Sequence, residues 1–209
     1  ILEKKRQTLP AICPAAPGVY EGEKLKREIK DRLIGNEQRT IPISRCMKLF
    51  EKSVFEGNEK YCDTKIHMGE DFNLVYPAML DSTRVVVMEE ALFYHYRYVE
   101  DSMVHCYVPD MAEGLERLRD FLDNGEAIER EYCYMLLLVM KNELRNPDKK
   151  YLQNIRGIFL SEKVRKRVLN TPLSVRERAN QLLYLGMQYP EKLLLRILRC
   201  IIRIYDRKK

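Results

Sequence analysis

The sequence has no tryptophan, only three histidines and no Cys-x-x-Cys pair among its six cysteines. Structural zinc sites need about four Cys or His ligands at close spacing, so we expect no metal site of this kind. The even number of cysteines permits disulfides without indicating them, and a reduced, cytoplasmic setting is the better interpretation. Cys133 and Cys200 lie in apolar helical patterns, and both are predicted to pack as small core residues.

Long apolar runs are also missing. The longest, residues 133–140, is too short to cross a bilayer, which takes roughly 20 residues in a helix. The chain opens on Ile1 without an initiator methionine or a signal-peptide pattern. We therefore expect a fragment whose N-terminal part lies outside this sequence.

The net charge of +6 is distributed unevenly along the chain. Residues 1–100 carry 16 basic and 16 acidic groups, and residues 101–148 carry 5 basic and 11 acidic groups. Residues 149–209 carry 16 basic and 4 acidic groups, a net charge of +12. This basic end suggests either an acidic partner or a solvated helix surface.

The first hundred residues combine helical and extended patterns. Residues 21–34 predict a helix, because Leu25, Ile29 and Leu33 recur at a spacing of four, and another helix is predicted from about residue 69 to 80. Pro77 is expected to kink or end that second helix. Residues 41–55 look at least partly extended, residues 84–88 predict a strand, and residues 92–98 predict a second, aromatic strand.

From Asp110 onward, only helical patterns remain. Helices are predicted over residues 110–122, 125–144, 151–169, 174–188 and 191–207, and the second is apolar nearly all round, as in a buried helix. The fold class is therefore α+β, with residues 1–108 as a mixed domain and residues 109–209 as a helical C-terminal domain.

Gly69-Glu70-Asp71 is the motif that most directly suggests chemistry. Two acids at a helix start can simply stabilise the helix dipole, each by about 0.3–1 kcal/mol. A carboxylate at the start of a helix after a loop can also act as a general base on a substrate hydroxyl. A metal-independent hydrolase using both acids is less favoured, because adjacent helical residues point about 100° apart.

Other segments accompany the Gly69-Glu70-Asp71 motif in a fixed order along the chain. The motif is preceded by Lys48-Leu49-Phe50 and followed by the valine strand Val85-Val86-Val87, the aromatic segment 92–97 and Ser102. This order and spacing resemble the second half of family 2 glycosyltransferases, over roughly residues 10–105. The resemblance implies the acceptor-side half of a GT-A-like α/β domain.

The resemblance also implies roles for particular residues. Asp71 would be the catalytic base that activates an acceptor hydroxyl for inverting transfer, and Glu70 a neighbouring catalytic or acceptor-orienting group. Lys48, His95 and Arg97 would bind substrate, the last two near the donor diphosphate or its metal. The implied partners are a nucleotide-sugar donor and a saccharide or lipid-linked acceptor in cell-surface polysaccharide or glycan synthesis, with Mn²⁺ or Mg²⁺ as cofactor.

One departure limits this expectation. The family holds its donor and metal through an N-terminal half that ends in an Asp-x-Asp motif, and this sequence contains no Asp-x-Asp. The donor half and most metal ligands would then lie outside the chain, and the isolated chain is expected to be inactive. An isolated half-domain would also leave a sheet edge uncovered, which favours a homo-oligomer.

The C-terminal segment offers an alternative function. Lys192, Arg196, Arg199, Arg203 and Arg207 recur at helical spacing and form one basic stripe beside a wide apolar face. Such a helix can lie on an anionic membrane, which would place the protein peripherally at its cytoplasmic face, or it can close a helical bundle. The alternative is thus a non-catalytic interaction module that binds a membrane or a partner. Nucleic acid is not expected, because no aromatic residues interleave with the basic ones.

Overall fold

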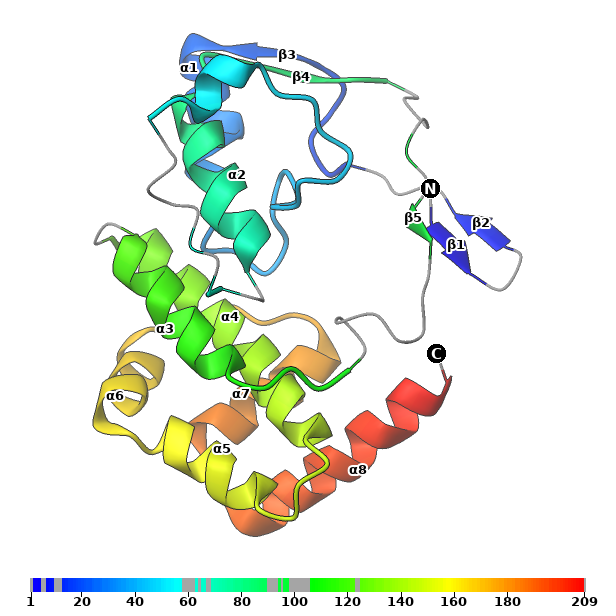
Figure 1. The fold of residues 1–209 in the computed structure, drawn as a ribbon, viewed down its shortest axis with the longest axis vertical. Coiled ribbons are helices and arrows are strands. Elements are labelled where there is room, and N and C mark those ends of the chain that lie inside the picture. Colours follow the sequence, from blue (N-terminus) through cyan, green and yellow to red (C-terminus); the bar gives the residue numbers. More distant parts are fainter. Residues whose placement is uncertain are drawn as a thin grey trace. The chain divides into compact units, whose positions relative to one another are not determined.

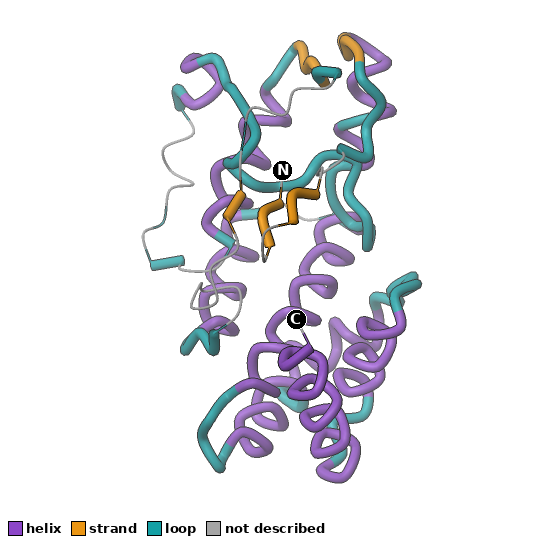
Figure 2. Tube along the Cα trace, turned by 90° about the vertical axis from the view of Figure 1, so that its right-hand side faces the viewer, coloured by secondary structure: helices purple, strands orange, loops and turns teal. Residues whose placement is uncertain are grey.

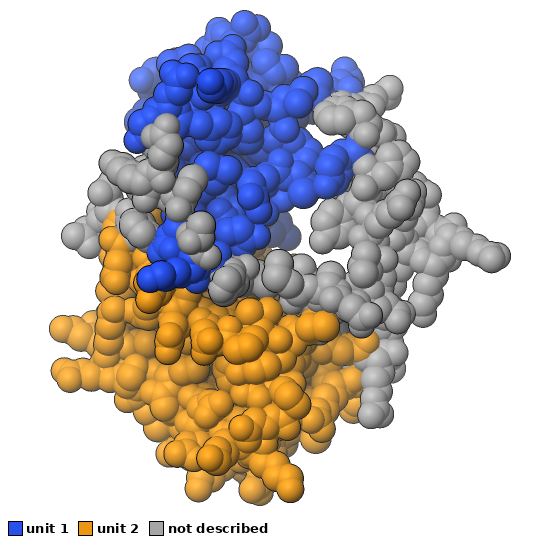
Figure 3. Space-filling view, viewed as in Figure 1, with its two compact units in different colours: residues 1–34, 38–101 blue, residues 35–37, 102–209 orange. Residues whose placement is uncertain are grey.

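A computed structural model describes residues 2–4, 7–9, 13–57, 63, 65–66, 69–89, 94, 96–97, 106–122 and 125–208. The fold is α+β, as predicted. The chain divides into two compact units (Figure 3). The first comprises residues 1–34 and 38–101, and the second comprises residues 35–37 and 102–209.

The described residues of the mixed unit form two small sheets. Strand β3 (Gly18–Glu21) pairs antiparallel with β4 (Arg84–Val87), with Tyr20 opposite Val85 (Figure 1). Strand β1 (Leu2–Lys4) pairs antiparallel with β2 (Gln7–Leu9) and parallel with β5 (Tyr96–Arg97). The strand predicted at residues 84–88 is confirmed, whereas β3 was not predicted. Of the predicted aromatic strand at 92–98, the structure describes only Tyr94 and the two residues of β5.

The first predicted helix is shorter than expected. Helix α1 (Gly22–Glu28) ends early, and a 3-10 turn, η1 (Lys30–Arg32), follows it. Leu25, Ile29 and Leu33 are nonetheless all buried. Residues 41–55, predicted as extended or partly so, form no strand: the segment is irregular and ends in the 3-10 helix η2 (Lys52–Phe55).

Helix α2 (Glu70–Asp81) confirms the predicted helix after Gly69. It buries Phe72, Val75, Ala78 and Met79. Pro77 does not end it, since the helix continues to Asp81. The side chain of Ser82 closes the C-terminal end by donating a hydrogen bond to the carbonyl of Ala78 at 2.7 Å.

In the second unit, every regular element among the described residues is a helix, and loops connect the helices (Figure 2). Its central element is α4, which contacts each of the other five helices described in the unit. Around α4, the core is formed by fully or almost fully buried side chains such as Leu136, Met140, Leu144, Phe159 and Leu195. The bounds are α3 (Met111–Phe121), α4 (Glu126–Arg145), α5 (Tyr151–Phe159), α6 (Glu162–Asn170), α7 (Arg178–Gln188) and α8 (Lys192–Lys208).

Two helix predictions in this unit need correction. The single helix predicted over residues 151–169 is two helices, because the chain leaves helical geometry at Ser161, with φ −58° and ψ 140°. This break lets both short helices turn a buried residue inward, Phe159 on α5 and Val164 on α6. Helix α7 begins at Arg178 instead of residue 174, and its start is bound by Glu37, which lies far away in the sequence.

Glu37 supplies the missing cap. Its carboxylate accepts hydrogen bonds from the backbone N–H groups of Arg176, at 2.6 Å, and Glu177, at 3.3 Å, and from the Asn180 side chain at 3.0 Å. Unpaired N–H groups at a helix start favour a carboxylate acceptor. Burial alone would raise the pKa of Glu37, but these hydrogen bonds lower it below the ordinary value.

Residues 35–37 thus belong to the helical unit. The backbone N–H of Gly35 donates to Glu131 Oε2 at 2.8 Å, and the Glu131 side chain is fully buried in α4. Arg130 Nε donates to the Gly35 carbonyl at 3.3 Å. Among the described helices, none combines the length and apolar character needed to cross a membrane.

Candidate functional site

The predicted catalytic acids lie in the first turn of α2. The preceding residue, Gly69, has φ 98° and ψ 6°, a left-handed conformation that costs little only for glycine. Helix α2 begins directly after this glycine, so Glu70 and Asp71 lie in its first turn, beside the positive end of the helix dipole. Both carboxylates stay partly exposed, and the Asp71 side chain retains 31% of its accessible surface.

Arg45 binds both acids. Its Nε donates a hydrogen bond to Asp71 Oδ1, and its Nη2 lies 3.5 Å from Glu70 Oε1. The hydrogen bond to Asp71 is the main reason why the pKa of Arg45 is raised above its ordinary value. One guanidinium therefore holds two neighbouring carboxylates, which face the same cation from the first turn of α2.

A tight turn presents Arg45 to the helix. The Cys46 N–H donates to Ser44 Oγ at 3.2 Å, and Lys48 Nζ donates to the Ser44 carbonyl at 2.8 Å. Met47 has φ 61°, a left-handed conformation that is uncommon for a non-glycine residue and that reverses the chain between Arg45 and Lys48. Tyr94 Oη donates to Cys46 Sγ at 3.1 Å on the same turn.

Lys48 is the second cation near the acids. Burial lowers its pKa from the ordinary value, while the charges of Cys13, Asp71 and Cys46 act in the opposite direction. A partly desolvated ammonium interacts more strongly with an approaching anion than a fully hydrated one. Lys48 is therefore suited to contact a phosphate or a hydroxyl close to Asp71.

The structure thus brings together three of the five predicted site residues, Lys48, Glu70 and Asp71. Arg97 lies in β5, where it pairs with Glu3 through the backbone. His95 lies outside the described residues, so its predicted role stays a prediction. Arg45 was not predicted as a site residue, because its contact with Asp71 spans 26 positions and no local pattern marks it.

The expected metal has no ligand set in the part of the chain that the structure describes. No group of three His, Cys, Asp or Glu side chains there could hold a cation. The Arg45 guanidinium also pairs with both Glu70 and Asp71, and its positive charge opposes the binding of a cation by these two carboxylates. A divalent cation therefore does not fit these residues.

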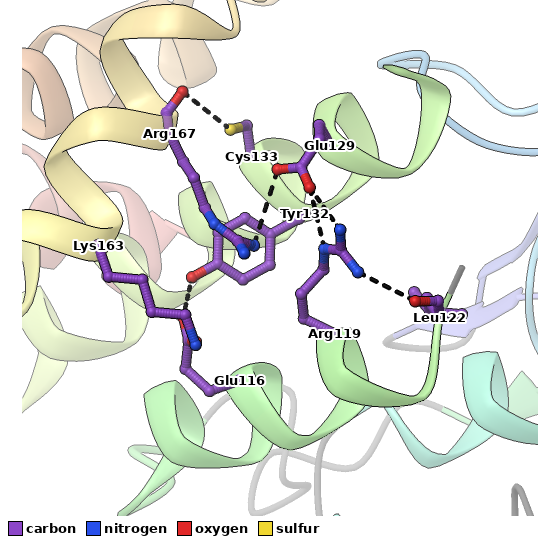
Figure 4. Close-up of polar contacts among 8 residues, drawn as sticks. All are labelled: Glu116, Arg119, Leu122, Glu129, Tyr132, Cys133, Lys163 and Arg167. Carbon is purple, nitrogen blue, oxygen red and sulfur yellow. Dashed lines mark hydrogen bonds and ion pairs between the residues drawn. The ribbon is translucent and has the colours of Figure 1, made fainter. Parts of the chain in front are cut away.

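A second polar cluster lies inside the helical unit, between α3, α4 and α6 (Figure 4). Glu116 accepts a hydrogen bond from Tyr132 Oη and pairs with Lys163. Arg119 Nε donates to Glu129 Oε1 at 3.2 Å, and the Arg119 Nη1 donates to the Leu122 carbonyl at 3.0 Å. Arg167 Nη1 lies 3.7 Å from the other Glu129 oxygen, and its guanidinium lies 4.9 Å from the centre of the Tyr132 ring.

This cluster has the properties of a structural network. Burial is the main cause that raises the pKa of Tyr132, with the hydrogen bond to Glu116 adding to it, and burial raises the pKa of Cys133 to about 12. A thiol of such high pKa is almost wholly protonated at neutral pH and is a poor nucleophile. Each acid of the cluster is paired with a base, so the network joins three helices and leaves the α2 site as the better candidate for chemistry.

The chain matches no protein-family model, no curated protein and no solved structure.

Proposed function

We propose that this chain is the acceptor side of an inverting nucleotide-sugar glycosyltransferase, with Asp71 as the general base. The proposal rests on the ordered motifs from Lys48 to Ser102 and on the geometry of the α2 start. The acceptor would be a saccharide or a lipid-linked saccharide, in the synthesis of a cell-surface polysaccharide or glycan. The nucleotide-sugar and its divalent cation, Mn²⁺ or Mg²⁺, would bind mainly through residues beyond those described.

The observation that carries the proposal is how Asp71 is held. Arg45 Nε engages Oδ1 of the carboxylate, and the side chain remains partly exposed to solvent. In the proposed reaction, Oδ2 accepts the proton of the acceptor hydroxyl while the hydroxyl oxygen attacks the anomeric carbon of the donor sugar. The bond from that carbon to the diphosphate breaks, and the nucleoside diphosphate leaves.

The neighbouring residues would position this base. Arg45 restrains the orientation of the carboxylate, which keeps Oδ2 within reach of one acceptor position. Glu70, held by the same guanidinium, would accept a hydrogen bond from another hydroxyl of the acceptor. Lys48 would donate to the departing diphosphate or to the acceptor, where its partial burial strengthens the interaction.

The direct test is Asp71→Asn in the gene product that contains this chain, with nucleoside diphosphate release as the readout. Asparagine keeps the size and can still accept the hydrogen bond from Arg45, but it cannot accept a proton. General-base catalysis contributes roughly 10²–10⁴-fold, so we expect a fall in kcat of at least about 100-fold. The matched control is Glu162→Gln, which neutralises an acid in the first turn of α6 and should leave kcat unchanged.

The outcome can also go against the proposal. Transfer at a near-normal rate by a correctly folded Asp71→Asn protein removes Asp71 from the base role. An inspection of the coding sequence upstream of Ile1 provides a second test, because the donor half should be present there with an Asp-x-Asp motif. Its absence from the gene would contradict the transferase assignment.

A further inference from the structure

Helix α8 has one face packed against the helical unit. Leu195, Leu198 and Ile202 are buried on this face, and α8 contacts α4 and α7. Arg199 is also turned inward, with only 9% of its surface exposed. Its Nη2 donates to the Asn146 carbonyl at 2.7 Å, and its guanidinium lies 3.6 Å from the centre of the Tyr151 ring.

This placement corrects the prediction of one continuous basic stripe. Arg199 is not available to a partner, because its hydrogen bond and its aromatic contact lie inside the unit. Cys200, predicted as a core residue, is instead exposed. The exposed residues of α8 therefore differ from those that the spacing of its basic residues predicts.

From Leu193 to Ile204, α8 turns an apolar row outward. Leu193 is 71% exposed, Ile197 50%, Ile201 40% and Ile204 56%. These residues recur at steps of four, four and three, which places them on one side of the helix over about 16 Å. Four aliphatic side chains in a continuous row on one exposed helix face are a feature of interaction surfaces.

A basic row borders this apolar face. Lys192, Arg196 and Arg203 are exposed and lie along one edge of it, since they precede Leu193, Ile197 and Ile204 by one residue each. The two acids nearest in sequence are engaged elsewhere. Asp206 forms two hydrogen bonds of 2.8 Å with Arg145, and Glu191 lies 3.8 Å from Arg156. The charged side chains along the edge of the apolar face are thus all positive.

We propose that this face of α8 binds the surface of an anionic phospholipid bilayer. The helix would lie parallel to the membrane, with Leu193, Ile197, Ile201 and Ile204 at the level of the upper acyl chains. Lys192, Arg196 and Arg203 would then meet the phosphate and carboxylate groups of the lipid heads. An apolar face with a basic border is the pattern of helices that lie in the interface plane.

Charge complementarity selects the bilayer over a second copy of the chain. An isologous contact through this face would supply only further basic groups to the basic row. A bilayer with anionic lipids supplies negative charge at the edge and an apolar layer directly beneath it. The net charge of +12 over residues 149–209 adds attraction at longer range.

The test is flotation of the full 209-residue chain with vesicles. Vesicles of phosphatidylcholine mixed with phosphatidylserine should carry the protein, pure phosphatidylcholine vesicles should carry much less, and added salt should weaken the binding. Replacing Arg196 and Arg203 by Gln should lower partitioning about five-fold per charge, or roughly 30-fold together. Ile197→Ser with Ile204→Ser should lower it about ten-fold or more, because apolar burial is lost.

Matched controls lie on α6. Leu169 is 54% exposed and Lys166 is exposed, so Leu169→Ser and Lys166→Gln repeat both chemical changes away from α8. These two variants should bind vesicles like the unaltered chain. Asp71→Asn should also bind normally, because the inference depends only on α8 and is independent of the proposed transferase activity.

Three results would overturn the inference. The first is equal binding to vesicles with and without phosphatidylserine, and the second is equal loss in the α6 and α8 variants. The third is a concentration-dependent dimer in sedimentation that the Ile197→Ser, Ile204→Ser variant abolishes, without vesicle binding by the unaltered chain. That last result would assign the face to a second copy.

Discussion

Gly35 is the position where a single methyl group should have a large effect. Its φ of +75° is left-handed, and a Cβ placed there would lie 2.8 Å from the carbonyl oxygen and 3.1 Å from the Cα of Ala127, in the first turn of α4. The neighbouring atoms belong to the backbone, so they cannot rotate away. We therefore predict that Gly35→Ala destabilises the helical unit.

The expected cost has two main parts. The left-handed conformation costs a non-glycine residue about 1–2 kcal/mol. Overpacking against a rigid neighbour costs about 1–3 kcal/mol more. Together they lower the free energy of unfolding by about 2–5 kcal/mol, and any shift of the Gly35 N–H away from the buried Glu131 carboxylate adds to this loss.

Urea unfolding followed by far-ultraviolet circular dichroism measures the change, because the helical unit dominates the signal. The matched control is Gly157→Ala in the same unit, where a Cβ meets nothing within 4 Å inside helix α5. Removing a helical glycine should raise stability by about 0.5–1 kcal/mol. A Gly35→Ala protein that loses less than about 1 kcal/mol would refute the reasoning, since the conformational cost alone should exceed that.

Three further predictions concern two polar contacts and the burial of a cysteine. Glu37→Gln should have a lower free energy of unfolding than the unaltered chain at pH 7. Because the pKa of Glu37 in the folded state lies below its ordinary value of 4.5, this stability difference is complete above pH 4.5 and disappears as the pH falls through the lowered pKa. Acid titration of both proteins measures the difference. A double-mutant cycle of Arg145→Gln and Asp206→Asn should give a coupling energy of about 1 kcal/mol or more, since the pair is bidentate and partly buried; a coupling of zero would contradict this. An aromatic disulfide reagent at pH 8 should modify exposed Cys200 at once and buried Cys133 only after unfolding, as peptide mapping would detect; early modification of Cys133 would show that its burial is not maintained.

Much of the helical architecture follows from local patterns. The helices over residues 110–122, 125–144 and 191–207 were predicted within about two residues, because apolar spacing and flanking glycine or proline residues are local signals. The break between α5 and α6 was missed, since the chain around Ser161 has no strong helix breaker. It is settled by packing, which buries Phe159 on one side of the break and Val164 on the other.

The candidate site was predictable in part. Glu70 and Asp71 follow a glycine at a helix start, and that pattern is visible in the sequence. Their partner Arg45 lies 26 residues before Asp71, and no periodic pattern connects the two positions. Its role depends on the turn at Met47, whose left-handed backbone is unusual for methionine and was therefore not predicted.

Helix α8 separates what local sequence determines from what depends on tertiary packing. The sequence by itself determined that residues 192–208 form a helix, that the helix is amphipathic and that its charges are mainly basic. Only the tertiary structure decided that Arg199 turns inward to Asn146 and Tyr151, while Ile197 and Ile204 turn outward beside Arg196 and Arg203. The physical reason is that periodicity specifies the faces of a helix, whereas the identity of the buried face depends on what α4 and α7 present to it.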